Sequence, residues 1–265
     1  MNLKTLSDCQ NELLLCKEDP YEYFQHNNID NIYRVCHPDK WLNDSELASD
    51  IFIKFGMLYD QSKDLKMIGD YRLIKEIAKG DLCDVFYAKR DLDKFVIKTP
   101  RVKAKTFIKK EFDVCKLISS EKIVYGKFVP HPVELVGDSI IYEYYDNLIS
   151  GAEVIGKFGD SLDSRHIVWM FKRTLIILGY IHYKGIVHGA ITPDHLLFNK
   201  KDHGLKICGW IHSGKEGGKI EVVPSKWKHY YPPSTVKDKM LTKSLDVYMC
   251  AKTFLDIGGS NLHKK

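Results

Sequence analysis

The sequence predicts an α+β protein in which a small all-α module precedes a two-lobed domain. Apolar residues recur at helical spacing up to about residue 62, whereas from Tyr71 onward they alternate or gather in short β-rich runs. The strongest helical pattern in the chain, over residues 165–183, comes after those runs and opens a helix-rich second half. Strands first and helices second is the order typical of the α+β class.

Composition narrows the kind of protein. The chain has 265 residues, of which 44% are hydrophobic and 28% are charged, a balance typical of globular proteins. The longest apolar run, residues 167–186, is interrupted by three cations, and nothing near Met1 resembles a secretory leader. We therefore expect neither secretion nor a membrane span. Seven cysteines without a C-x-x-C pair predict free thiols in a reducing, cytoplasmic compartment.

Charge is distributed unevenly along the chain. Residues 1–68 carry a net charge of −5 and the remainder carries +10. This division indicates two units that either have different partners or attract each other. The basic residues are scattered rather than interleaved with aromatic ones, so nucleic acid is not an expected partner.

The first seventy residues read as a helical hairpin. Helices are expected over residues 3–17, 29–36 and 45–62, and the pair Asp19-Pro20 is expected to stop or turn the first of them. Ser45 is a suitable cap for the third helix. The proline-bearing turn at residues 37–39 would join the second and third helices as an antiparallel pair.

This region resembles the J-domain family, whose members stimulate ATP hydrolysis by the seventy-kilodalton heat-shock chaperones. The resemblance is carried by the His37-Pro38-Asp39 tripeptide, by the aromatic stretch at residues 21–24, and by the spacing of Phe52, Phe55 and Tyr59. It implies that a chaperone contacts Arg34, His37, Pro38, Asp39 and Lys40. The helix before the tripeptide is short and offers few cations, so a hairpin kept only for docking or packing remains an alternative.

The next segment predicts a sheet with one helix inserted. Strands are expected over residues 71–77, 84–89 and 94–98, a helix over 106–119, and a hairpin over 133–136 and 139–144.

Residues 70–258 resemble the eukaryotic protein kinases. The resemblance is carried by five motifs in family order: residues 95–98, 186–197, 207–211, 230–234 and 245–248. It implies that Lys98 pairs with Glu111, that Gly80 belongs to the phosphate loop, and that Asp246 anchors the catalytic loop. The pair and Gly80 would serve either nucleotide binding or simple bracing of the small lobe.

The same motifs lack the side chains that family chemistry uses. Ala190 stands at the position of the catalytic aspartate, Thr192 at that of the phosphate-contacting lysine, and His195 and Gly209 at those of the two metal ligands. Because phosphoryl transfer depends on positioning and on Mg²⁺, we expect no catalytic residue, no metal and at most weak ATP binding.

The expected organisation is a J-like module at residues 1–66, a kinase-like small lobe at 67–146 and a truncated large lobe at 147–265. The favoured function is a catalytically inactive scaffold that recruits a protein client and engages a heat-shock chaperone. Two alternatives stay open. One is a divergent nucleotide-dependent phosphotransferase that uses Lys98 and His195, and the other is an interaction protein in which both modules are vestigial.

Overall fold

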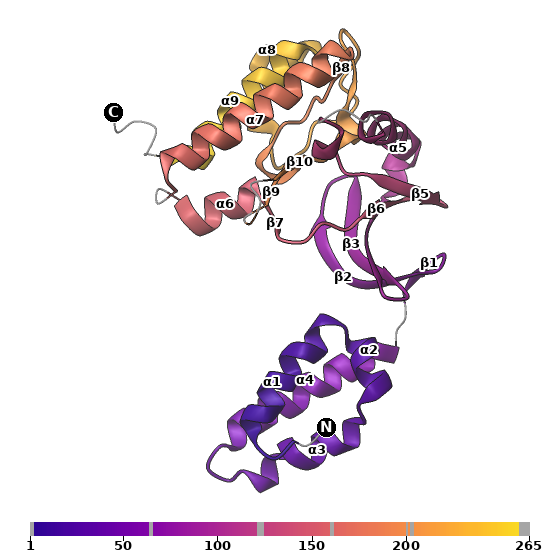
Figure 1. Cartoon of the computed structure of the whole chain (residues 1–265), viewed down its shortest axis with the longest axis vertical. Coiled ribbons are helices and arrows are strands. Elements are labelled where there is room, and N and C mark those ends of the chain that lie inside the picture. The colour runs from indigo at the N-terminus through magenta and orange to yellow at the C-terminus, as the bar shows by residue number, and fades with distance from the viewer. Residues whose placement is uncertain are drawn as a thin grey trace. The chain divides into compact units, whose positions relative to one another are not determined.

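The computed structural model describes residues 3–63, 66–120, 125–159, 162–199, 201 and 204–259, and Figure 1 shows the course of the chain. Contacts divide the chain into two compact units. The first unit comprises Met1–Glu76 together with Phe86–Asp93, and the second comprises Ile77–Val85 together with Lys94–Lys265. This division follows packing, and the predicted domain boundaries stay predictions.

The first unit begins with four helices: α1 (Leu6–Glu18), α2 (Pro20–His26), α3 (Ile29–Cys36) and α4 (Ser45–Lys63). Each of the first three starts at a polar cap, because the side chains of Thr5, Asp19 and Asn28 accept hydrogen bonds from the first turns. The pair Asp19-Pro20 ends α1 as expected and also begins α2, since proline suits the first position of a helix. The helices share a core of buried residues from all four: Leu6, Cys9, Leu13, Cys16, Tyr23, Ile32, Cys36, Ala48, Ile51 and Phe55.

A buried carboxylate joins these helices to the strands of the same unit. Asp19 accepts two hydrogen bonds from the Arg72 guanidinium, at 2.6 and 2.9 Å, and lies 2.9 Å from the Lys89 ammonium. Lys89 also contacts Glu22 at 2.6 Å, and the Arg72 guanidinium lies over the Tyr21 ring. Burial raises the pKa of Asp19, but the hydrogen bonds from Arg72 and Lys89 outweigh it and lower that pKa to about 2.

A six-stranded sheet follows, with strand order β1-β2-β3-β4-β6-β5. Its strands are β1 (Met67–Ile68), β2 (Tyr71–Lys79), β3 (Cys83–Arg90), β4 (Asp93–Pro100), β5 (Pro132–Val136) and β6 (Ser139–Glu143). β4 pairs antiparallel with β6, and this register places Lys98 opposite Ile140. Helix α5 (Lys105–Ser119) packs against β5 and β6, as Figure 1 shows. The strands and the helix predicted here are confirmed, each within a few residues.

The rest of the second unit is mostly helical. Its elements are β7 (Leu148–Ser150), α6 (Gly151–Phe158), α7 (Ser164–Tyr183), β8 (Ile186–Val187), β9 (Leu196–Asn199), β10 (Leu205–Ile207), β11 (Gly214–Lys215), α8 (Pro233–Asp238) and α9 (Lys243–Gly258). Helices α7 and α9 pack on each other, and small sheets form from β10-β9-β7 and from β11-β8. Within the described residues, no helix is both long and apolar enough to cross a membrane. The mixture of helix and sheet agrees with the α+β prediction at this coarse level.

Candidate functional site

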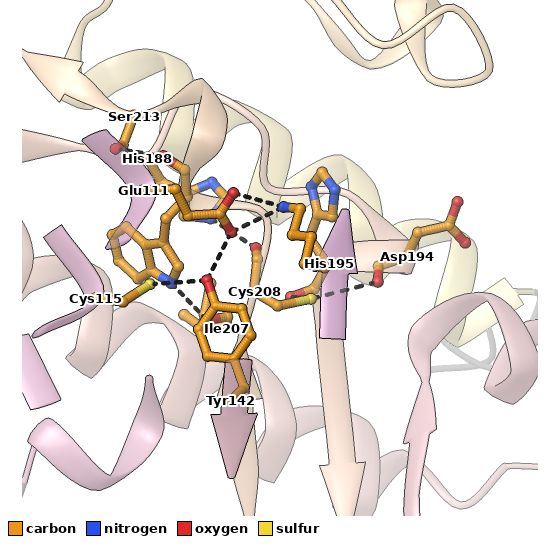
Figure 2. Close-up of polar contacts among 11 residues, drawn as sticks. Glu111, Cys115, Tyr142, His188, Asp194, His195, Ile207, Cys208 and Ser213 are labelled. Carbon is orange, nitrogen blue, oxygen red and sulfur yellow. Dashed lines mark hydrogen bonds and ion pairs between the residues drawn. The ribbon is translucent and has the colours of Figure 1, made fainter. Parts of the chain in front are cut away.

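A buried ion pair forms the centre of the candidate site, and it lies wholly in the second unit. Lys98 on β4 donates to both carboxylate oxygens of Glu111 on α5, at 2.8 and 2.6 Å (Figure 2). The Lys98 side chain is 13% exposed and that of Glu111 only 2%. Burial lowers the pKa of Lys98, but the charge of Glu111 more than compensates and raises it overall. The lysine is therefore a permanent cation at neutral pH.

Neighbouring groups hold Glu111 in place. The Tyr142 hydroxyl on β6 donates to the Glu111 carboxylate at 3.2 Å. The adjacent Lys110 ammonium donates to the carbonyl oxygen of Ser213 at 2.7 Å, which ties α5 to the turn that follows Gly209. Helix α5 thus presents Glu111 to Lys98 from a fixed position.

A second buried carboxylate holds the segment that begins at His188. Asp246 on α9 is fully buried and accepts hydrogen bonds from the backbone amides of His188 at 2.8 Å and Gly189 at 2.7 Å. His182 Nε2 on α7 lies 2.8 Å from the same carboxylate. The Tyr231 hydroxyl also donates to the Gly189 carbonyl, at 2.7 Å. Buried polar contacts therefore hold the backbone at His188 and Gly189.

The residues that replace the family's catalytic groups lie along this segment. Ala190 and Thr192 are fully buried, and among the described residues the Thr192 hydroxyl finds no hydrogen-bond partner. Asp194 contacts the Lys226 ammonium at 2.8 Å and the Trp227 indole N–H at 2.7 Å, so its carboxylate faces those residues. None of these three positions supplies a carboxylate directed at Lys98.

His195 fills the space that Gly209 leaves. Gly209 adopts a left-handed conformation with φ of +84°, and a Cβ atom there would lie only 2.6 to 2.7 Å from three atoms of the His195 ring. The His195 Nδ1 lies 2.7 Å from the carbonyl oxygen of Ala190. A side chain at position 209 and the imidazole of His195 in this position therefore exclude each other.

Three imidazoles gather beside the ion pair. The His195 ring centroid lies 6.0 Å from that of His188 and 5.7 Å from that of His212. Burial, followed by the charges of neighbouring histidines and Lys98, lowers the pKa of His188 to about 3 and that of His212 well below its usual value. For His195, burial is again the main cause of a lowered pKa. Sequence reasoning missed His212, and the signal that could have found it is its place three residues after Gly209.

These residues do not fit Mg²⁺, the ion that the kinase resemblance implies. Mg²⁺ prefers oxygen ligands in octahedral geometry, and Ala190, His195 and Gly209 offer none from their side chains. Within the described parts of the chain, no group of three or more His, Cys, Asp or Glu side chains is arranged to hold a metal ion. These three positions therefore give Mg²⁺ no side-chain oxygen through which it could assist phosphoryl transfer.

The turn between β2 and β3 contacts a distant loop of the second unit. Gly80 donates its N–H to the Cys83 carbonyl at 2.9 Å, which closes the turn. The neighbouring Asp81 carboxylate accepts from the backbone N–H of Ser225 at 2.6 Å and from its hydroxyl at 2.9 Å. The kinase resemblance predicts that this turn binds phosphates. In the structure, two hydrogen bonds tie it to Ser225, the residue before the Lys226 that contacts Asp194.

The predicted chaperone-contact residues lie together in the first unit. Arg34, His37, Asp39 and Lys40 are exposed, and Pro38 is half-buried. His37 Nδ1 accepts the Asp39 backbone N–H at 3.3 Å, and the Lys40 ammonium donates to the Arg34 carbonyl at 2.5 Å. The loop is therefore folded onto the end of α3, with its tripeptide at the surface.

No protein-family model matches the chain. The chain is 28% identical to a probable casein kinase II subunit alpha homologue of Encephalitozoon cuniculi over 143 residues, 54% of this chain and 43% of that protein. It is 26% identical to a probable serine/threonine-protein kinase of Dictyostelium discoideum over 224 residues, 75% of this chain and 35% of that protein. Mitogen-activated protein kinase homolog 1 of Petunia hybrida is 26% identical over 156 residues, 57% of this chain and 40% of that protein.

These relatives correct one expectation. The absence of four family side chains led to the prediction that the chain is not an enzyme, whereas the proteins it resembles are named as protein kinases. That prediction is contradicted, because it treated the loss of family carboxylates as the loss of all chemistry. The chain spans less than half the length of the relatives named above. Together with the mixed helix and sheet architecture, the comparisons support a protein-kinase-like fold.

Proposed function

We propose that the chain is a nucleotide-dependent phosphotransferase of the protein-kinase type with a divergent site. The observation that carries the proposal is the Lys98–Glu111 pair, in which a buried cation stays charged beside a buried carboxylate. A buried ion pair is weak support for stability, because desolvation offsets most of its Coulombic attraction. Binding of a negatively charged ligand by the Lys98 ammonium explains this buried pair better than a contribution to stability does.

Lys98 would hold the phosphates of a nucleoside triphosphate. Glu111 fixes the direction of the ammonium, and Asp246 holds the backbone at His188 and Gly189, at the start of the loop that leads to His195. His195 then places a neutral imidazole near the phosphates that Lys98 would hold. Positioning of this kind accounts for most of the catalysis in phosphoryl transfer.

The rate should be low compared with an enzyme that has the family's carboxylates. Removal of one electrostatic stabiliser from an active site typically costs about 10² to 10³ in rate, and here several such groups are replaced. Slow single-turnover transfer, followed with γ-labelled ATP at high protein concentration, is therefore the appropriate assay.

Nucleotide binding tests the first step of the proposal. Titration of ATP into the full chain should show saturable binding, and Lys98→Ala should weaken it by about tenfold or more, since a charge-assisted contact contributes about 1.5 to 3 kcal/mol. Lys94→Ala is the matched control, because Lys94 lies on the same strand, is half exposed and pairs with Asp146. Equal ATP affinity of the original protein and Lys98→Ala would contradict the proposal.

A second candidate function concerns the first unit. We propose that the tripeptide loop engages a seventy-kilodalton heat-shock chaperone and delivers a client bound elsewhere on the chain. The supporting observation is the surface position of His37 and Asp39 beside the exposed cations Arg34 and Lys40. The low positive charge near this loop predicts slow association that depends weakly on salt.

Chaperone ATPase activity tests this candidate. The full chain should raise the steady-state ATPase rate of such a chaperone, and His37→Gln should abolish the increase. Lys54→Gln is the control, because Lys54 is exposed on α4 and pairs only with Asp50 among the contacts described. An ATPase rate unchanged by the chain, or raised equally by His37→Gln, would refute this candidate.

A further inference from the structure

We infer that His195 and His212 form a two-imidazole site for a divalent transition-metal ion, of the class of Zn²⁺ or Co²⁺, that enters the site bound to nucleotide phosphates. The inference rests on the proposed nucleotide binding and deepens it by naming the metal. It begins from the misfit of this site to Mg²⁺ and from the positions of the three neighbouring histidines.

Hydrogen bonds fix the tautomers of these histidines. A carbonyl oxygen only accepts, so His195 Nδ1 must carry the proton that it shares with the Ala190 carbonyl at 2.7 Å. The same reasoning places a proton on His212 Nδ1, which lies 3.2 Å from the Val222 carbonyl. In each neutral ring, Nε2 is then the nitrogen with a free lone pair. A metal-binding histidine is commonly held in this way, with its other nitrogen donating to a carbonyl.

His188 serves as an internal comparison. Its Nε2 donates to the Cys208 carbonyl at 2.9 Å, and its Nδ1 accepts the Ala190 backbone N–H at 3.2 Å. Both nitrogens are engaged, so this ring has no lone pair for a metal. The pair His195 and His212, with ring centroids 5.7 Å apart, is what remains.

Among the described residues, no third His, Cys, Asp or Glu side chain joins the pair as a ligand. The nearby Cys208 Sγ donates to the carbonyl oxygens of Asp194 at 3.8 Å and of His195 at 3.6 Å, so its thiol keeps a proton and is not a thiolate ligand. Two imidazoles fall short of the four ligands that Zn²⁺ usually takes, and phosphate oxygens can complete the set. Phosphate charge also offsets the repulsion between a divalent ion and the Lys98 ammonium, which binds the same phosphates.

The chemistry of the ligands decides the metal. Imidazole nitrogen suits Zn²⁺, Co²⁺ and related ions, whereas Mg²⁺ favours carboxylate, carbonyl and water oxygens. The site should therefore prefer the transition-metal complex of a nucleotide over its magnesium complex.

The test measures binding of ATP to the full chain in the presence of Co²⁺, of Mg²⁺ and of no divalent ion. We expect ATP with Co²⁺ to bind at least about tenfold more tightly than ATP with Mg²⁺, and the Co²⁺ absorption spectrum to change on binding. His195→Asn and His212→Asn should each remove the preference and the spectral change. His229→Gln is the control, because His229 is an exposed histidine elsewhere in the unit and should change neither.

Thermal unfolding of the variants keeps the test decisive. If His195→Asn and His212→Asn still unfold in one cooperative transition and yet lack the cobalt preference, their site is folded and the loss is specific to the metal. Equal affinity with Co²⁺, Mg²⁺ and no ion, together with loss of binding in Lys98→Ala, would overturn this inference and leave the proposed function intact. A cobalt preference that survives both substitutions would overturn it too. Absence of ATP binding under every condition would overturn both.

Discussion

The Asp19 carboxylate gives the sharpest prediction about stability. Asp19→Asn keeps the shape of the side chain and an oxygen that can cap α2, but it removes the charge that faces Arg72 and Lys89. The Asp19 side chain is 9% exposed and its two partners are 15% and 17% exposed, so water replaces the lost contacts poorly. We expect the substitution to destabilise the first unit.

The lowered pKa sets the size of the effect. A fall of the Asp19 pKa from 3.8 to about 2 corresponds to roughly 2 kcal/mol of folding free energy at neutral pH. Because the folded pKa lies below the unfolded one, this contribution is complete above the unfolded value and is lost as pH falls toward 2. By linkage, about half should be gone near pH 3.

Hydrogen exchange of peptides from the first unit, measured across this pH range, provides the assay. The original protein should be more protected than Asp19→Asn by roughly 2 kcal/mol at pH 7, and the two should converge near pH 2. Asp50→Asn is the control, because its exposed pair with Lys54 should contribute well under about 1 kcal/mol. A difference that is absent at pH 7, or that persists undiminished at pH 2, would show that the Asp19 charge does not stabilise the first unit through Arg72 and Lys89.

Two further predictions concern the second unit. Asp246→Asn should lower the stability of that unit by about 2 to 4 kcal/mol, because the amide group cannot accept all the hydrogen bonds that the buried carboxylate receives. Thermal unfolding measures this loss. An unchanged melting temperature would count against the role of Asp246 as an anchor. Gly209→Ala should cost at least about 1 to 2 kcal/mol from its left-handed conformation alone, plus displacement of the His195 ring. Combining it with His195→Ala should restore the second part, so strictly additive losses in a double-mutant cycle would contradict the packing described.

Local patterns predicted much of the secondary structure. The helix expected over residues 29–36 is α3 with the same bounds, because its apolar residues recur at helical spacing and Asn28 caps it. Helix α6 was not expected, although Ser150 and Glu153 form a capping box that the sequence could have indicated. Short elements of this kind are stabilised by packing more than by their own pattern.

Contacts between residues far apart in the chain could not be predicted from local sequence patterns. Asp19 meets Arg72 and Lys89, which lie more than fifty residues further along the chain, and no spacing rule brings these residues together. The pair Lys98 and Glu111 was expected only through the kinase resemblance. His212 was missed because its role depends on the turn after Gly209, where a glycine allows the neighbouring ring to approach.

Transfer of labelled phosphate from γ-labelled ATP, under single-turnover conditions with Co²⁺ or Mg²⁺ present, decides whether the chain is a phosphotransferase. We expect slow transfer to an acceptor protein or to the chain itself, faster with Co²⁺ and lost in Lys98→Ala. Transfer that continues at the same rate in purified Lys98→Ala, or no transfer at all while ATP is bound, would contradict this expectation.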